Sequence, residues 1–167
     1  MADDVAQFLT GHQLRLSRLA LVLSGDHHLA QDLVQDTMVK IVRKWDVVRR
    51  SDDPTGYTAQ MMINQWRDSA RSFARRRARE GLATIERSER SDADEAGVAD
   101  LLDQITVRQA MALLTEKQRL VLYLRFFEDR PVAEAARLLG CAEGTVKSQT
   151  SAAIRRLHEH LEVSVDD

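Results

Sequence analysis

The 167-residue chain contains very little cysteine and few prolines, glycines and aromatic residues. Cys141 is the only cysteine, which excludes a disulfide within the chain and a zinc site built from cysteines. Two prolines, seven glycines and 5% aromatic residues leave few helix breakers and few strand formers, so we predict an all-α fold. No apolar run approaches the ~20 residues that span a bilayer, and acids stand in Met1–Asp4 where a secretory signal would carry positive charge. We therefore expect no membrane insertion and a cytoplasmic location.

The chain also lacks a large net charge, since its formal net charge at pH 7 is −2. Basic and acidic residues are nevertheless concentrated in different segments. Trp66–Glu80 holds six arginines and two acids, whereas Glu86–Asp103 holds seven acids and two arginines. The basic segment suits a nucleic-acid partner. The acidic segment has few large apolar residues, so we predict a flexible acidic linker over residues 81–103. This linker separates a domain at 1–80 from a domain at 104–167.

Apolar residues in the first half recur at helical spacing. The first run stops at Gly25, and we expect Asp26 to cap a second helix over about Leu29–Trp45. At 100° per residue, one largely apolar face of this helix gathers Ala30, Val34, Thr37, Met38, Ile41, Val42 and Trp45. The opposite face gathers Asp32, Asp36, Val39 and Arg43, flanked by Gln35 and Lys40. A third helix begins near Pro54 and carries the arginines.

The second half has the pattern of two helices around a tight break. After a short helix at Ile105–Leu114, Thr115–Gln118 has the form of a capping box, and its helix runs through Leu120, Val121, Leu124 and Phe127. Pro131 starts another helix, and Gly140 lies in the break before a last helix that reaches Leu161. One side of the last helix carries small or cationic residues, which suits the DNA major groove, although a merely solvated face fits too. These residues are Lys147, Ser148, Ser151 and Arg155, with Ala152 at the edge.

Motifs in both halves resemble extracytoplasmic-function sigma factors of the sigma-70 family. Ala135–Ser148 resembles the region that reads the −35 promoter element, and Leu114–Arg119 resembles the start of the same domain. Leu29–Asp36 resembles the helix that binds RNA polymerase. Pro54–Arg79, with Tyr57, Asn64, Trp66 and Arg67 at matching positions, looks like the helix that reads the −10 element. The resemblance covers about Phe8 to Leu161, and the stretch Lys147–Ser151 is similar to an actinobacterial branch.

The resemblance implies a sigma factor with a region 2-like helical bundle and a region 4-like helix-turn-helix, which recognises −10 and −35 elements and aids promoter melting. It implies core RNA polymerase as partner, through the clamp helices of the largest subunit and the beta flap, together with promoter DNA. Family members are commonly held inactive by an anti-sigma factor. The resemblance implies no cofactor, metal, catalysis or small-molecule substrate.

Three groups of contact residues follow from the resemblance. The polymerase-binding group is Asp32, Gln35, Asp36, Val39, Lys40 and Arg43. The −10 group is Tyr57, Asn64, Arg67, Arg71, Arg75 and Arg76, and the loop from about Val47 to Thr55 is expected to form a pocket for a base flipped out of the stack. The −35 group is Thr145, Lys147, Ser148, Ser151, Ala152 and Arg155. Gln149, Ala152 and Ile154 depart from arginines that many relatives carry, so the −35 sequence does not follow by analogy.

Three other functions remain open from the residues alone. A dimeric activator or repressor could use the same helix-turn-helix, but it would need a dimer interface or a sensor pocket in the first half. An enzyme has thin support, because His27-His28 and His158-Glu159-His160 lack metal-site spacing. A structural helical adaptor would be favoured if DNA and polymerase binding were both absent. Pull-down of core polymerase separates the sigma-factor hypothesis from the dimeric regulator.

Overall fold

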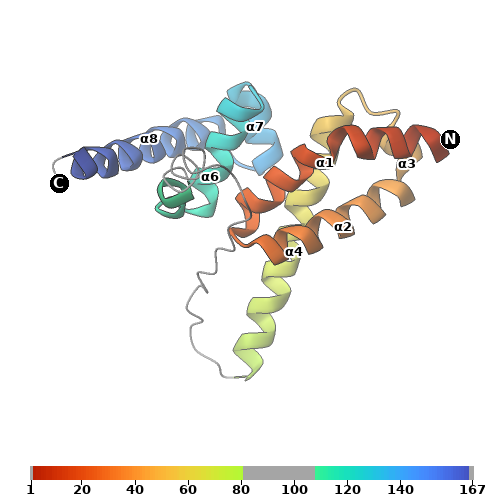
Figure 1. Ribbon diagram of the computed structural model, residues 1–167, viewed down its shortest axis with the longest axis horizontal. Helices are drawn as coiled ribbons and strands as arrows, with labels where there is room; N and C mark the ends of the chain where they lie inside the picture. Colours follow the sequence, from red (N-terminus) through yellow and green to blue (C-terminus); the bar gives the residue numbers. More distant parts are fainter. Residues whose placement is uncertain (1, 81–107, 166–167) are drawn as a thin grey trace, which may run out of the picture. The chain divides into compact units, whose positions relative to one another are not determined.

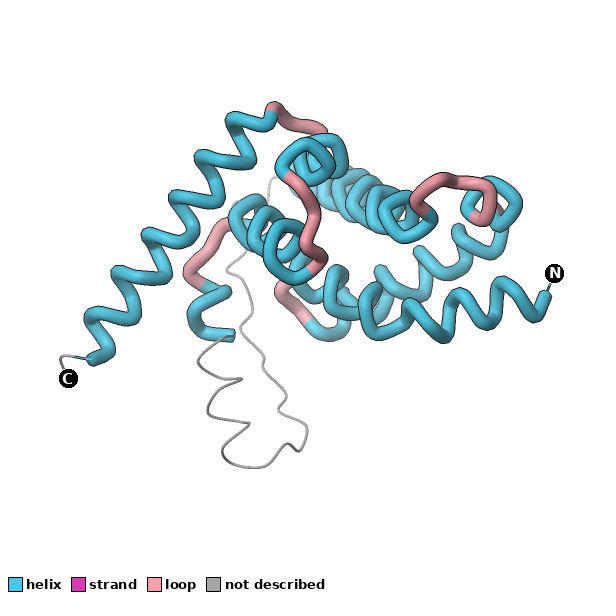
Figure 2. The backbone as a smooth tube through the Cα atoms, turned by 90° about the horizontal axis from the view of Figure 1, so that it is seen from above, coloured by secondary structure: helices cyan, strands magenta, loops and turns pink. Residues whose placement is uncertain are grey.

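A computed structural model describes residues 2–80 and 108–165, and the chain divides into two compact units, Met1–Ser91 and Asp92–Asp167 (Figure 1). Every regular element within the described residues is a helix, which confirms the all-α prediction (Figure 2). The linker predicted at residues 81–103 falls among residues that the structure does not describe, so the domain boundaries stay predictions.

The first unit is a bundle of α1 (Ala2–Ser24), α2 (His27–Arg43), α3 (Trp45–Val48) and α4 (Pro54–Glu80). α1 and α2 pack against each other and both pack on α4. The connection between α1 and α2 is tight, because Gly25 adopts φ 66° and the Asp26 carboxylate accepts the Leu29 N–H at 2.9 Å, as a helix cap should. The fully buried side chains that hold the bundle are Leu16, Leu19, Leu23, Ile41, Val48, Met62 and Ile63.

Two details of the predicted second helix are wrong: the residue at which it ends, and one residue assigned to its buried face. α2 ends at Arg43, and Trp45 opens the separate short helix α3. Val42, placed by the helical wheel with the apolar face, is 51% exposed, whereas Leu33 is buried in its stead. The buried stripe is centred on Val34, Thr37 and Ile41, and a step of one residue turns Val42 by about 100° away from it. Thr37 is tolerated in the core because its hydroxyl donates to the Leu33 carbonyl at 2.7 Å.

The last three turns of α4 project beyond the helices that pack on its first half (Figure 1). Met62 and Ile63 are buried, but the side chains from Asp68 to Arg76 are all exposed. Phe73 is 55% exposed, and the Arg77 guanidinium lies 5.6 Å from the centre of its ring. The basic segment found in the sequence is therefore a solvent-facing helix end.

The second unit contains α6 (Glu116–Leu122), the π-helix η1 (Tyr123–Phe127), α7 (Val132–Leu139) and α8 (Glu143–Val165). Helix is described from residue 108 to 112 within the short helix predicted at Ile105–Leu114, and the earlier part lies outside the described residues. α6 and α7 both pack on α8. The fully or nearly fully buried side chains are Leu114, Leu120, Val121, Leu124, Leu138, Leu139, Val146 and Ala153.

The capping box predicted at Thr115–Gln118 is confirmed. The Thr115 hydroxyl accepts the Gln118 N–H at 3.2 Å, and the Gln118 side chain accepts the Thr115 N–H at 3.2 Å. The single α-helix predicted through Phe127 is wrong, because α6 ends at Leu122 and the chain continues as a π-turn. There the Glu128 N–H bonds the Tyr123 carbonyl at 3.0 Å, five residues back, and Phe127 is left 68% exposed.

Candidate functional site

All six members of the polymerase-binding group lie exposed on α2: Asp32, Gln35, Asp36, Val39, Lys40 and Arg43. They form one stripe opposite the buried face, acidic in the first half of the helix and basic in its last turn. Cations near a helix C-terminus are favoured by the helix dipole. Within the described residues, no ion pair engages the charged side chains of this group, so they are available to a partner. A contact with polymerase itself stays a prediction.

The −10 group is mostly brought onto one face of α4. Taking 100° per residue from Asn64, the positions of Tyr57, Arg67, Arg71 and Arg75 fall within about 60° of it, whereas Arg76 lies about 120° away. Asn64 is exposed, and its side-chain carbonyl accepts the Gln60 amide at 3.1 Å. That bond leaves the Asn64 NH₂ group directed to solvent as a donor. Five of the six residues can therefore face one nucleic-acid strand, and Arg76 cannot share that face.

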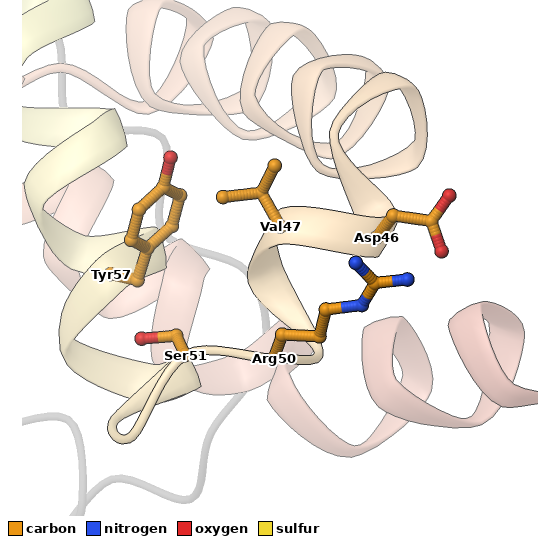
Figure 3. A pocket seen from close by; sticks show the side chains of 5 residues that line it. All are labelled: Asp46, Val47, Arg50, Ser51 and Tyr57. Carbon is orange, nitrogen blue, oxygen red and sulfur yellow. The ribbon is translucent and has the colours of Figure 1, made fainter.

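A pocket of about 410 Å³ lies beside this face (Figure 3). Its lining comes from α3, from the loop that follows, and from the first turn of α4: Asp46, Val47, Arg50, Ser51 and Tyr57. The resemblance implied a pocket for a flipped-out base in the loop at about Val47 to Thr55, and Val47, Arg50 and Ser51 of this loop line the pocket; binding of a base there stays a prediction. Asp46 was missed because it directly precedes the loop, on α3. The pocket is largely open to solvent.

Hydrogen bonds of 2.8 to 3.3 Å and one ion pair connect residues in and beside the pocket. The Arg49 guanidinium contacts Asp46 Oδ1 at 2.7 and 2.8 Å. The Asp53 carboxylate accepts the Gly56 N–H at 2.8 Å, and the Ser51 hydroxyl oxygen accepts the Asp53 N–H at 3.3 Å. These contacts fix the entry into α4, so Tyr57 is presented from a defined first turn.

α1 supports the same corner of the bundle, through residues that the sequence gave no functional role. The His12 ring is stacked on Phe8, with centroids 4.0 Å apart, and its Nδ1 lies 2.8 Å from the Phe8 carbonyl. His12 Nε2 lies 3.4 Å from the Thr55 hydroxyl at the start of α4. Phe8 also contacts Trp45 of α3, with ring centroids 5.3 Å apart. The start of α4 and the start of α3 are thus both tied to α1.

The −35 group lies at the start and along the outer side of α8. Lys147, Ser148, Ser151 and Arg155 are exposed, and Thr145 and Ala152 are half-buried. Val146 and Ala153 are fully buried on the opposite side, as the helical wheel predicted. Gly140 makes the turn before this helix with φ 64°, a left-handed conformation that favours glycine. The predicted helix-turn-helix is therefore present, with its small and cationic residues outward.

The second unit exposes several apolar residues, and the exposure of its two phenylalanines was not predicted. Phe126 and Phe127 are 58% and 68% exposed, and Ile154 is 39% exposed. The π-turn places the two phenylalanines outward, and no helical-wheel argument based on 100° per residue could find that. Within 2–80 and 108–165, no group of three or more potential metal-ligating side chains occurs, and none of the helices there combines the length and apolarity required to cross a bilayer.

Comparison with known proteins covers both units. Residues 8–79 match the family described as Sigma-70 region 2, and residues 104–157 match the family described as Sigma-70, region 4. The chain is 31% identical over 166 residues to an RNA polymerase sigma-E factor of Streptomyces avermitilis, covering 95% of this chain and 86% of the relative. It is 32% identical over 158 residues to the ECF RNA polymerase sigma factor SigL of Mycobacterium tuberculosis, covering 90% and 85%.

A solved structure agrees with these sequence relatives. The sigma factor RpoE of Bartonella quintana, solved in complex with the anti-sigma factor NepR, matches with a TM-score of 0.79 and 29% identity over 96% of this chain and 98% of that chain. The Streptomyces and Mycobacterium relatives agree with the actinobacterial-type branch that the Lys147–Ser151 pattern resembles. The chain therefore belongs to the sigma-70 family of RNA polymerase sigma factors, in its extracytoplasmic-function class, and is a promoter-specific transcription initiation factor.

Proposed function

We propose that three surfaces divide the work of initiation: the exposed stripe of α2 docks on core polymerase, the outer side of α8 reads −35 duplex, and the α4 face with its pocket captures the melting −10 element. The observation that carries this proposal is the arrangement along α4, which has a pocket at its first turn, the exposed Asn64 in its middle and a projecting basic end. A helix that is merely solvated does not require a pocket at its first turn, whereas a helix that captures an unpaired base does.

Docking on polymerase rests on charge. The α2 stripe runs from Asp32 and Asp36 to Lys40 and Arg43, so a partner helix pair with the opposite order of charges would satisfy it. Val39, 49% exposed at the middle of the stripe, supplies an apolar contact that becomes buried on docking. The clamp helices of the largest polymerase subunit are the proposed partner.

Capture of the −10 element requires no nucleotide hydrolysis. Unpairing and unstacking a base costs a few kcal/mol. Stacking on an aromatic side chain contributes about 1–3 kcal/mol per base, which Tyr57 can supply at the pocket. Arg67, Arg71 and Arg75 then neutralise the phosphates of the separated strand, and the Asn64 amide donates to a base edge. Binding energy thus offsets melting, and we propose that the protein catalyses nothing itself.

Recognition of the −35 element uses duplex DNA. Lys147 and Arg155 stand on the outer side of α8 together with the hydroxyls of Ser148 and Ser151. Gly144 in the first turn leaves open space, with nothing within 4 Å of the position a Cβ would take, so a phosphate can approach the backbone closely. Because both DNA-binding units belong to one chain, the second contact is effectively intramolecular and specificity emerges in the holoenzyme.

Location and regulation follow from the partners. Core polymerase and chromosomal promoters are cytoplasmic, so we place the working protein there. The Bartonella quintana relative is solved with an anti-sigma factor, and we propose that a partner of this class also restrains this chain. The beta flap is the second polymerase contact, and the exposed Phe126 and Phe127 offer it an apolar surface on the second unit.

In vitro transcription tests the proposal. Purified chain and core polymerase are incubated with a genomic library of upstream regions, and start sites are mapped. We expect a small set of discrete start sites that core polymerase alone does not produce. Absence of any start site would contradict the proposal. A dimeric regulator would instead bind duplex DNA as a dimer without polymerase, which sedimentation of the free chain on DNA detects.

A further inference from the structure

The projecting end of α4 has a second face, opposite the face that carries Asn64. Counted at 100° per residue, Phe73 lies about 180° from Asn64. Arg76 and Arg77 flank it, at about 120° and 140° from Asn64 in opposite senses. We propose that this second face binds the complementary strand of the melted promoter and stacks one of its bases on Phe73. The inference rests on the proposed function, because the Asn64 face must hold the first strand.

Phe73 is a large apolar side chain on a part of α4 that extends past the rest of the first unit (Figure 1). It is 55% exposed, and every side chain from Asp68 to Arg76 is exposed with it. Phenylalanine is a poorer helix former than alanine. Neither core packing nor helix propensity therefore accounts for a phenylalanine at this position, whereas a partner that covers the ring would remove its apolar surface from water.

A cation holds the Phe73 ring in place. The Arg77 guanidinium lies over the ring, 5.6 Å from its centre, and Arg77 is half-buried although Arg76 and Ala78 beside it are exposed. A cation–π contact of this kind restricts the orientation of the ring. One face of the ring is taken by the guanidinium, so the other face can receive a flat partner without a further loss of ring freedom.

Small residues precede the ring on the surface of the helix. Ser69 and Ala70 stand four and three residues before Phe73, so they are its neighbours toward the start of α4. Both are exposed, and neither reaches as far from the helix axis as a phenylalanine does. A base therefore has room beside the ring. From Ser69 to Arg77 this face carries two arginines and no acid, so it attracts phosphate.

An exposed ring between two guanidinium groups has the chemistry of a single-strand binding site. Every base has a π-face that can stack on an aromatic side chain, and arginines neutralise the phosphates on either side of it. Contacts of this kind tolerate any base sequence. An acidic protein segment would satisfy Arg76 and Arg77 but would use the flat face of Phe73 less well than a base does, so we assign the face to nucleic acid.

A single strand cannot use both faces of α4 at once. The arginines of the Asn64 face lie within about 60° of Asn64, and a helix with its side chains is about 10–12 Å across. A strand that follows those arginines therefore passes Phe73 on the far side of the helix. The complementary strand, once separated, can pass along that far side. α4 would then stand between the two strands and hinder their re-pairing.

Two DNAs test the inference with the holoenzyme formed by the full chain and core polymerase. One is the single strand that carries the −10 sequence, and the other is a preformed bubble that contains both strands. Phe73→Leu keeps an apolar side chain but removes the π-face. Its affinity for the bubble should fall about tenfold, as for the loss of one stacked base, and its affinity for the single strand should not change. Phe73→Tyr keeps a π-face and should bind both DNAs like wild type.

An abasic scan of the complementary strand locates the stacked base. Removal of one particular base should weaken wild-type binding to the bubble about tenfold and should have no further effect on Phe73→Leu. Ser72→Ala is the matched control, because Ser72 is an exposed neighbour of Phe73 outside the second face, and it should leave both affinities unchanged. Circular dichroism checks that each variant keeps its helices.

The outcomes separate the inference from the proposed function. Wild-type affinity of Phe73→Leu for the bubble, or equal weakening on the bubble and on the single strand, overturns the inference alone. Weakened binding of Phe73→Leu to core polymerase would assign the second face to a protein contact and would also overturn it. A wild-type holoenzyme that binds neither DNA refutes the proposed function, and the inference falls with it.

Discussion

Removal of the capping box should destabilise the second unit and leave the first untouched. In Thr115→Ala the Gln118 N–H loses its acceptor at 3.2 Å, and the reciprocal bond from Gln118 loses its fixed geometry. An N-cap threonine contributes about 1 kcal/mol. Gln118 is 8% exposed, so the freed N–H is poorly solvated and the cost should lie nearer 2 kcal/mol.

Hydrogen exchange on the full chain measures this loss in each unit. Since 1.4 kcal/mol is a factor of ten in an equilibrium constant, amides of α6 and of the neighbouring α8 should exchange about 5- to 30-fold faster. Amides of α2 and of the buried part of α4 should keep their rates. Thr115→Ser, which keeps the hydroxyl, is the control and should resemble wild type. Unchanged protection of α6 in Thr115→Ala would refute the assignment of the cap as a stabilising element.

The remaining predictions concern the three surfaces. Reversing charge with Asp32→Lys and Asp36→Lys should weaken core binding at least tenfold without unfolding the chain, measured by fluorescence titration with core polymerase, and unaltered affinity would refute docking through α2. Asn64→Ala should reduce open-complex formation severalfold in a permanganate assay and spare −35 duplex binding, whereas equal loss of both would argue against a −10 role. Lys147→Glu should lower promoter affinity about tenfold and reduce its salt dependence in a filter-binding series, and a retained −35 footprint would contradict groove entry.

Much of the architecture could be predicted from local chemistry. Gly25 and Gly140 end helices where a left-handed residue is required, and Asp26 and Thr115 cap the helices that follow. Such signals are local because each one serves a single helix end. The outward faces of α2 and α8 were predictable for a related reason, since charged side chains are seldom buried without a partner.

The errors arose where the backbone departs from ideal α-geometry. The wheel assumes 100° per residue, and it fails at the π-turn after Leu122, where Phe127 turns outward. Val42 is a different error: on an ideal wheel it already lies about 100° from Ile41, so the apolar face had been centred too far from Leu33. Asp46 lines the pocket because the chain bends between α2 and α3. Residues brought together by a bend between two helices leave no periodic trace in the sequence.

The projecting end of α4 carries a ladder of like charges, because Arg67, Arg71, Arg75 and Arg79 follow one another at intervals of four residues. Each such neighbouring pair opposes helix formation by about 0.2–0.5 kcal/mol, so the three pairs together amount to on the order of 1 kcal/mol. A polyanion bound along these four arginines removes the repulsion between them. On the proposed −10 contact, promoter DNA acts as the counterion of this helix end, so added salt should stabilise the free helix and weaken its binding to the promoter.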